Sequence, residues 1–232
     1  NPYLSFKINV EGTLNLLEVC RQRDIKLLYT SSGSVYGKIL EGAKESNPLN
    51  PQDMYGMTKA CSELLGLQYS NTYGLDFVSV RLYFLFGKGM NVSLKEVFNP
   101  PIVPQNILFL FLFKALKKEK LKIEKGGESK IDFTYVKDAV HGIILAYYKK
   151  GKSKVYNISN GRAYSLKDIA DIINNYVGDK IIEIGDGELV GWPPRAPFLD
   201  VSKAKEELGY EPIYGLEKGI REFYEELKLN PC

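Results

Sequence analysis

Two stretches of helical periodicity alternate with two short apolar runs near the start of the chain, and this alternation limits the fold more than any other feature. Apolar residues recur at helical spacing over 5–23 and 53–73, while short apolar runs cover 25–29 and 76–83. Strands that alternate with helices pair in parallel, because each helix carries the chain back across the sheet. We therefore predict a parallel sheet with crossover helices, and Asp53 as the N-cap of the second helix.

The remainder of the chain is less regular and predicts a mixture of helices and strands. The very apolar segment from Ile107 to Leu116 is too short to cross a bilayer and predicts a buried helix. The elements expected after it are a strand over 131–136, a helix beginning near Asp138, a strand over 154–158, a helix capped by Ser165, and short helices within 201–227.

Composition and charge exclude several classes of protein. The chain is 44% hydrophobic and 25% charged, and it contains no apolar run long enough to span a membrane. Its net charge is only +3, with lysines spread among acidic residues, so a nucleic-acid partner is not expected. Cys20, Cys61 and Cys232 form neither a disulfide pattern nor a metal motif, which is typical of reduced thiols in the cytoplasm.

Tyr55 and Lys59 stand four residues apart at the start of the second predicted helix. This spacing puts both side chains on one face, one turn apart. A phenol titrates near pH ~10, and a neighbouring ammonium lowers its pKa. A fall of about 3 pH units corresponds to roughly 4 kcal/mol, of which Lys59 supplies part. In a chain with 16 tyrosines the pattern alone is weak, and a solvated helix face is the alternative interpretation.

A cluster of hydroxyl groups follows the first predicted strand, from Thr30 to Ser34. Open α/β sheets bind ligands beyond the carboxyl ends of their strands, so a ligand is expected at this cluster. A hydroxyl there can share the hydrogen bond of a substrate oxygen with Tyr55. The two signals together favour catalysis over a solvated helix face.

The chain resembles the extended short-chain dehydrogenase/reductases, the NAD-dependent epimerase/dehydratase family that includes UDP-glucose and UDP-galactose 4-epimerases. The resemblance covers nearly the whole chain. Its motifs are Asn9-Val10-Glu11-Gly12-Thr13, the segment from Thr30 to Gly37, Tyr55 with Lys59, Arg81 with Gly87, the segment from Asp132 to Asp138, Tyr156-Asn157-Ile158, and Asp200 to Ala204 with Leu208 to Pro212.

This resemblance implies an enzyme that transfers a hydride from a sugar carbon to NAD or NADP, while Tyr55 removes the hydroxyl proton. Lys59 would hold the nicotinamide ribose and polarise Tyr55, and Ser32 would be the hydroxyl partner. The implied catalytic residues are Tyr55, Lys59 and Ser32, the cofactor-binding residues are Tyr55, Lys59, Ser31 and Asn9, and the substrate-binding residues are Ser32, Ser34, Phe84, Lys88 and Arg195. A structural role is the alternative for Asn9. A homodimer through the helices near 5–23 and 53–73 is also implied.

The resemblance also implies the fold class, which is α/β. We expect a partial Rossmann-like doubly wound parallel sheet with a smaller mixed α/β C-terminal substrate lobe. Residues 1–90 would form the C-terminal part of the cofactor domain with the catalytic residues. Residues 91–232 would form the substrate-binding lobe, interleaved with a returning segment of the sheet.

The glycine-rich turn G-x-x-G-x-x-G, which holds a pyrophosphate at a helix N-terminus, does not occur in this chain. We therefore expect either a truncated cofactor domain or a sheet that a separate polypeptide completes. Both possibilities predict weak dinucleotide binding and an exposed apolar edge of the sheet.

Two further departures from the family bear on the reaction. Gly33 and Ser34 stand where dehydratases of the family carry Asp-Glu, which favours an epimerase or a dehydrogenase. Phe84 and Ile131 replace an Asn and an Arg that bind a substrate diphosphate, and the cations that could compensate are Lys88, Lys130 and Arg195. The leading hypothesis is a sugar or sugar-nucleotide 4-epimerase. The alternatives are a dehydrogenase or reductase of a non-nucleotide sugar or uronic acid, and a non-catalytic fragment or assembly partner.

Overall fold

The computed structural model describes residues 1–89, 104–149, 151–189 and 196–229. A parallel sheet of three strands lies at its centre, with β2 (Phe77–Leu82) between β1 (Leu27–Ser32) and β7 (Val155–Ile158). In the register of these strands, Thr30 lies beside Val80, which in turn lies beside Tyr156. The predicted parallel pairing is therefore confirmed.

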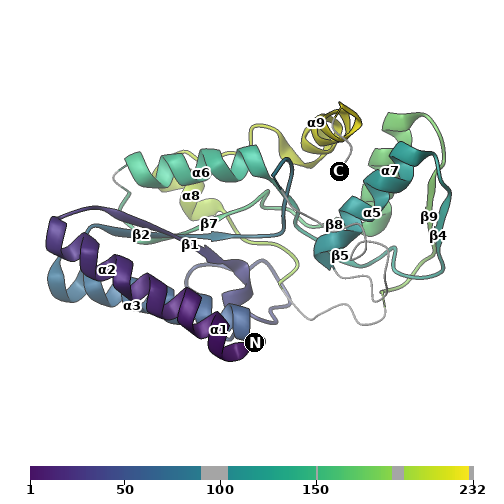
Figure 1. Cartoon of the computed structure of the whole chain (residues 1–232). Coiled ribbons are helices and arrows are strands. Elements are labelled where there is room, and N and C mark those ends of the chain that lie inside the picture. The colour runs from purple at the N-terminus through teal and green to yellow at the C-terminus, as the bar shows by residue number, and fades with distance from the viewer. Residues whose placement is uncertain (90–103, 150, 190–195, 230–232) are drawn as a thin grey trace.

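Helices cover both faces of this sheet (Figure 1). On one face lie α2 (Gly12–Arg23) and α3 (Met54–Tyr73), where Leu17 and Phe77 belong to one buried cluster. On the other lie α6 (Val136–Tyr148) and α8 (Ser202–Leu208), which bury Val78 together with Leu208. Phe77 and Val78 face opposite layers because successive side chains of a strand alternate. The sheet is thus doubly wound, as the sequence predicts.

The helix predicted over 5–23 is divided into three parts. These are α1 (Pro2–Phe6), a π-helical turn (Lys7–Glu11) and α2. The predicted end is confirmed, because Asp24 adopts a left-handed conformation with a φ of 54° and closes α2. The predicted N-cap of α3 is also confirmed, since the Asp53 side chain accepts a hydrogen bond of 2.7 Å from the Gly56 N–H.

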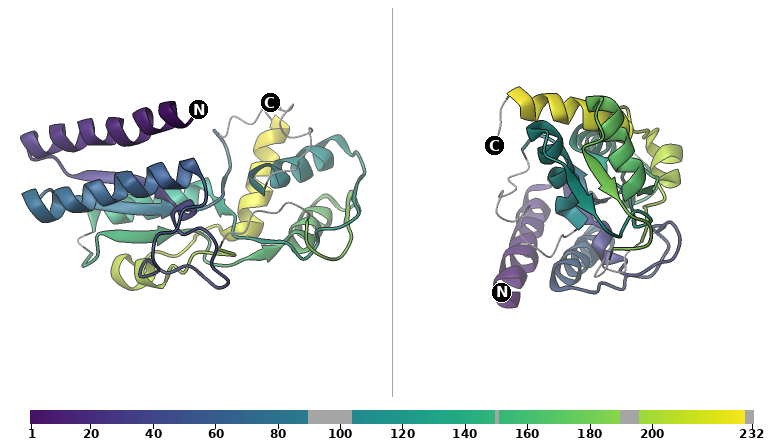
Figure 2. Two further views of the ribbon diagram at one scale, coloured as in Figure 1. Left: turned by 90° about the horizontal axis from the view of Figure 1, so that it is seen from below. Right: turned by 90° about the vertical axis from the view of Figure 1, so that its right-hand side faces the viewer.

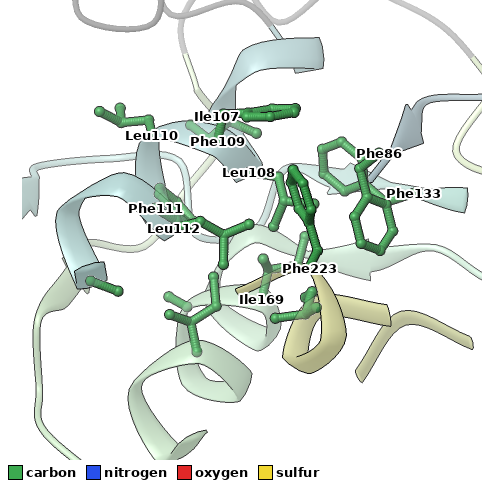
Figure 3. Close-up of a cluster of buried hydrophobic side chains, with 14 of the residues drawn as sticks. Phe86, Ile107, Leu108, Phe109, Leu110, Phe111, Leu112, Phe133, Ile169 and Phe223 are labelled. Atoms are coloured by element: carbon green, nitrogen blue, oxygen red, sulfur yellow. The ribbon is translucent and has the colours of Figure 1, made fainter. Parts of the chain in front are cut away.

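A smaller lobe is built on α5 (Pro104–Lys117), α7 (Leu166–Val177) and α9 (Gly215–Leu229). Two parallel strands, β4 (Leu121–Ile123) and β9 (Ile182–Ile184), lie at its outer side (Figure 2). Figure 3 shows side chains of α5, α7 and α9 packed together, among them Phe109, Ile169 and Phe223. All side chains over 107–113 are buried, which confirms the predicted buried helix and explains why this stretch of α5 is apolar on every face.

The division of the chain at residue 90 remains a prediction. Three elements beyond that residue, α6, β7 and α8, belong to the layers of the central sheet rather than to the smaller lobe. The sequence analysis expects a returning segment of the sheet in this part of the chain. α9 lies between the sheet layer and the rest of the lobe in Figure 1.

The predicted strand over 131–136 is wrong as a continuous element. β5 (Lys130–Ile131) pairs antiparallel with β8 (Tyr164–Ser165), whereas β6 (Thr134–Tyr135) pairs parallel with β3 (Leu85–Phe86). The break falls at Asp132, because its buried carboxylate accepts hydrogen bonds from Ser159 Oγ and from the Leu199 N–H.

The later helix boundaries follow the sequence in part. α6 begins at Val136, and Asp138 in its first turn accepts hydrogen bonds from the N–H groups of Ile213, Tyr214 and Gly215, which hold the turn before α9. Ser165 caps α7 as predicted. Over the described ranges, none of the helices combines the length and apolar character needed to span a membrane.

Candidate active site

Two serines form the carboxyl end of β1, which extends three residues beyond the run predicted over 25–29. Ser31 and Ser32 both lie within the strand, and both side chains are buried. Ser32 Oγ accepts a hydrogen bond of 3.2 Å from the Ser34 N–H and so caps the short 3-10 helix Gly33–Val35. Ser31 Oγ is buried and has no hydrogen-bond partner among the described residues. The end of β1 therefore presents hydroxyl groups at the place where open α/β sheets bind ligands.

Tyr55 and Lys59 lie on the first turns of α3, next to the end of β1. Lys59 Nζ donates a hydrogen bond of 2.8 Å to the main-chain oxygen of Thr30. The same nitrogen lies 5.9 Å from the centre of the Tyr55 ring, so the two side chains share one face of the helix as predicted. Burial lowers the pKa of Lys59, whereas the Tyr55 side chain is 50% exposed and accessible to a ligand.

Gly56 allows the start of α3 to approach the end of β1 closely. A β-carbon at Gly56 would lie 2.6 Å from the main-chain oxygen of Ser34, a distance that real side chains do not adopt. Any larger residue would push α3 away from the 3-10 helix. The glycine between Tyr55 and Lys59 is thus a packing requirement of the site, because it lets the start of α3 lie against the main chain of Ser34.

Asn9 lies in the π-helical turn and contacts α3 rather than the end of β1. Its Nδ2 donates to Thr58 Oγ1 at 2.9 Å, and Thr58 Oγ1 donates to the main-chain oxygen of Tyr55 at 2.9 Å. The Asn9 main-chain oxygen accepts a hydrogen bond from Ser62 Oγ at 2.9 Å. These contacts favour the structural interpretation of Asn9. Sequence reasoning missed Thr58 and Ser62, although two polar residues four apart on a buried helix face are a usable signal.

A buried polar network lies on the strand next to the serines, where Arg81 pairs with Ser31 in the register, and it joins α3 to the sheet. Arg81 Nε donates to both carboxylate oxygens of Glu63, and Arg81 Nη1 donates to Tyr36 Oη at 2.6 Å. Tyr36 Oη in turn donates to Asn157 Oδ1 at 2.7 Å. Burial raises the pKa of Tyr36 to about 12, although Arg81 acts in the opposite direction. The sequence analysis named Arg81 and Tyr36 only as parts of motifs and missed Glu63.

The expected substrate-binding residues are only partly brought together. Ser32 caps the 3-10 helix that contains Ser34, and the main chain of Ser34 lies against Gly56 at the start of α3. Phe84 instead packs edge-on against Tyr83, with ring centres 4.5 Å apart. Lys88 is exposed beyond β3. Arg195 lies outside the described residues.

Lys130 lines a separate open cleft of 690 Å³. Two further cations that the sequence analysis did not identify, Lys44 and Arg162, line the same cleft together with Asp200. In the part of the chain that the structure describes, no group of three metal-ligating side chains is assembled.

The doubly wound parallel sheet, the strand-end serines and the Tyr-x-x-x-Lys pair on the next helix define a Rossmann-fold protein of the short-chain dehydrogenase/reductase class. The family model described as "NAD dependent epimerase/dehydratase family" matches residues 1–159. The chain belongs to this family.

Similar proteins span several reactions of the family. A putative UDP-glucose 4-epimerase of Methanocaldococcus jannaschii is 31% identical over 99% of this chain and 72% of its own length. UDP-glucuronic acid decarboxylase 3 of Arabidopsis thaliana is 29% identical over 99% of this chain, which spans 65% of the plant protein. The crystal structure of UDP-glucose 4-epimerase from Thermotoga maritima with UDP-glucose superposes with a TM-score of 0.81, at 26% identity, over 99% of this chain and 72% of the epimerase.

Proposed function

We propose that this protein takes part in NAD-dependent epimerisation of a nucleotide sugar at a carbinol carbon, with Tyr55 as the acid/base. The observation that carries the proposal is the position of Lys59, which donates to Thr30 O at the end of β1 while its ammonium lies 5.9 Å from the Tyr55 ring centre. As a general rule a positive charge next to a phenol favours its phenolate form, and Lys59 would play this part for Tyr55.

The groups at the end of β1 fit a nicotinamide ribose. Thr30 O uses one of the three N–H donors of Lys59, which leaves donors that can bind ribose hydroxyls. The buried Ser31 Oγ, unpartnered in the described structure, supplies a further donor and acceptor. When bound here, NAD supplies the hydride acceptor, which no protein side chain provides.

The chain's own residues would perform the proton transfer. Tyr55, 50% exposed on the first turn of α3, would accept the proton of a substrate hydroxyl and later return it. Lys59 would favour the charged form of Tyr55 throughout this cycle. Ser32, at the end of β1, would hydrogen-bond the same substrate oxygen and hold it near the phenol.

The environment of Gly33 supports epimerisation over loss of water. A β-carbon at this residue would lie 2.4 Å from the ring of Tyr83 and 3.1 Å from Leu199. A carboxylate side chain therefore has no room at this position unless Tyr83 moves. Water elimination needs an acid and a base beside the leaving group, and this position offers neither. A dehydrogenase or reductase of a non-nucleotide sugar or uronic acid is the second candidate, because Phe84 and Ile131 replace the Asn and Arg that would bind a substrate diphosphate.

We propose that tight NAD binding depends on a strand and a glycine-rich turn from outside these 232 residues. β1 is an edge strand of the described sheet, and its free edge can pair with a further parallel strand. The chain alone should bind NAD(H) weakly. Part of the Methanocaldococcus jannaschii relative has no counterpart in this chain, and adding that part as a separate polypeptide should raise the affinity for NAD(H). If the added polypeptide binds to this chain but the affinity for NAD(H) stays the same, the proposed assembly is wrong.

We further propose a cytoplasmic homodimer that associates through α2 and α3. Both helices expose large apolar side chains, including Leu16 at 57% and Leu64 at 54% exposure. Apolar side chains that gather on adjacent helices typically mark a protein interface. Cys20 and Cys61 are free thiols, which fits a reducing compartment.

The proposed activity is tested by incubating the protein with millimolar NAD and either UDP-glucose or UDP-glucuronate, with and without the added archaeal stretch. We expect slow formation of the sugar epimerised at one carbon, detected by chromatography, and loss of that product with Tyr55→Phe. Full activity of Tyr55→Phe would rule out the assigned mechanism. Absence of turnover under all of these conditions would favour a non-catalytic assembly role.

A further inference from the structure

Tyr29 lies on β1, one residue before the Thr30 carbonyl that binds Lys59. Its side chain packs against the buried cluster between the sheet and the layer of α2 and α3. Because side chains alternate along a strand, Tyr29 and Ser31 face the same side, toward α3. Tyr29 therefore lies on the inner side of the site, where sequence reasoning assigned no role.

The Lys59 ammonium lies over the ring of Tyr29. Nζ is 5.0 Å from the centre of this ring and 5.9 Å from the centre of the Tyr55 ring. Both distances are within the ~6 Å at which a cation is attracted to the face of an aromatic ring, and the contact with Tyr29 is the closer one. The ammonium is thus held by one strand carbonyl and by two aromatic rings, one from β1 and one from α3.

Tyr29 acts on Lys59 as an uncharged ring. Burial raises the pKa of Tyr29 to about 12, so its hydroxyl keeps its proton at neutral pH. The titratable groups near Tyr29 are Tyr55, Cys61 and Glu63. Glu63 forms an ion pair with Arg81. The attraction between Tyr29 and Lys59 is therefore that of a cation for the negative face of a neutral ring.

We propose that Tyr29 is a positioning residue that holds the ammonium of Lys59 between β1 and α3. The ring fixes one side of the ammonium and Thr30 O takes one N–H, so the remaining N–H donors are directed toward Tyr55 and the place of the nicotinamide ribose. This role rests on the proposed function, in which Lys59 stabilises the Tyr55 phenolate. Tyr29 itself does not contact the substrate.

The ring face favours the charged form of Lys59 and so opposes the effect of burial. Removing the ring while keeping the site buried should lower the pKa of Lys59 by about half a pH unit, as expected for loss of one cation–π contact. Removing only the hydroxyl should leave that pKa nearly unchanged. If Tyr29 had only a structural role, neither this fall in the pKa of Lys59 nor its dependence on the ring would be expected.

The test compares Tyr29→Phe, which keeps the ring, with Tyr29→Leu and Tyr29→Ile, which remove it. Isoleucine is a favourable residue in β-strands, so Tyr29→Ile provides a second variant without the ring if Tyr29→Leu does not fold. Lysines are labelled with ¹³C at Cε, Lys59 is assigned from the signal lost in Lys59→Arg, and its titration is followed by NMR. Tyr73→Leu, which removes an exposed tyrosine at the other end of α3, is the matched control.

We expect the Lys59 titration to move downward in Tyr29→Leu and Tyr29→Ile and to stay in place in Tyr29→Phe and Tyr73→Leu. Equal titrations in all folded variants would overturn the proposal. This measurement needs no turnover, so it separates the role of Tyr29 from the proposed activity. Where turnover is measurable, the pH–rate profile should change in Tyr29→Leu and Tyr29→Ile. In Tyr29→Phe it should match the profile of the original protein.

Discussion

Arg81 and Glu63 form an ion pair that is almost fully removed from solvent, with side-chain exposures of 5% and 0%. Glu63 belongs to α3, the helix that carries Tyr55 and Lys59, and Arg81 belongs to the central strand β2. Glu63 Oε2 also accepts a hydrogen bond of 2.8 Å from Ser79 Oγ. The ion pair therefore links the helix of the candidate site to the sheet. Neither side chain has access to water that could replace its partner.

Replacing one member of this pair should destabilise the fold strongly. Glu63→Gln leaves the buried guanidinium without its countercharge, and we expect a loss of about 3–5 kcal/mol in the free energy of unfolding. Urea unfolding followed by circular dichroism measures it. The double variant Glu63→Leu with Arg81→Met should lose less than Glu63→Gln, because it leaves no buried charge. If the free energy of unfolding of Glu63→Gln lies within about 1 kcal/mol of that of the original protein, the ion pair is solvated.

Tyr55→Phe should abolish proton transfer without affecting the fold. The phenol is half-exposed, so its loss leaves the free energy of unfolding nearly unchanged. Turnover should fall by about 10²–10⁴-fold, the usual contribution of a general acid or base. Steady-state rates and urea unfolding are compared on the same samples. A parallel loss of stability and activity would instead indicate a structural role.

The contact between Asn9 and Thr58 should stabilise the π-helical turn. Thr58 is 1% exposed, and Thr58→Val keeps its shape while leaving the Asn9 amide without an acceptor. We expect a loss of about 1–3 kcal/mol, as for a buried polar group deprived of its partner. Thr58→Ser keeps the hydroxyl and should recover most of this loss. If valine and serine are equally stable, the Asn9 amide has found another partner.

Stability should fall between pH 4 and pH 7 because of Asp132. Burial raises the pKa of Asp132 to about 7, with Ser159 acting in the opposite direction. The folded protein then holds a proton that the unfolded chain has released, so unfolding becomes easier as pH rises toward 7 and changes no further above it. The contribution of this group is roughly 4 kcal/mol.

Asp132→Asn isolates this contribution, because asparagine carries no titratable proton. The difference in unfolding free energy between Asp132→Asn and the original protein should shift in favour of the variant as pH rises from 4 to 7. Urea midpoints at four or more pH values measure it. A difference that stays constant over this range would mean that Asp132 is already ionised at pH 4.

A charge on the exposed face of α3 should dissociate the proposed dimer. Leu64→Glu places a carboxylate within that apolar face, and Leu40→Glu changes a side chain that is 86% exposed elsewhere, in the segment between β1 and α3. We expect sedimentation to show a monomer for Leu64→Glu and a dimer for the original chain and for Leu40→Glu. A monomeric original chain would refute the dimer directly.

Periodicity predicted the elements that local sequence controls. The ends of α3 at Asp53 and Gly74, the cap of α7 at Ser165 and the buried α5 all follow from side chains within a few residues. The strand over 131–136 failed because Asp132 is bound by residues far along the chain. The π-helical turn was also missed, since the same apolar spacing fits a continuous helix.

The sequence by itself determined the alternation of helices and strands, the parallel sheet and the approach of Tyr55 to Lys59, because helical and strand periods act over short distances. Only the tertiary structure decided the partners of those residues. Thr30 O and the Tyr29 ring contact Lys59 because α3 packs on β1. Thr58 contacts Asn9 because α3 packs on the π-helical turn. Such contacts depend on the distance between elements, and no spacing along the chain encodes that distance.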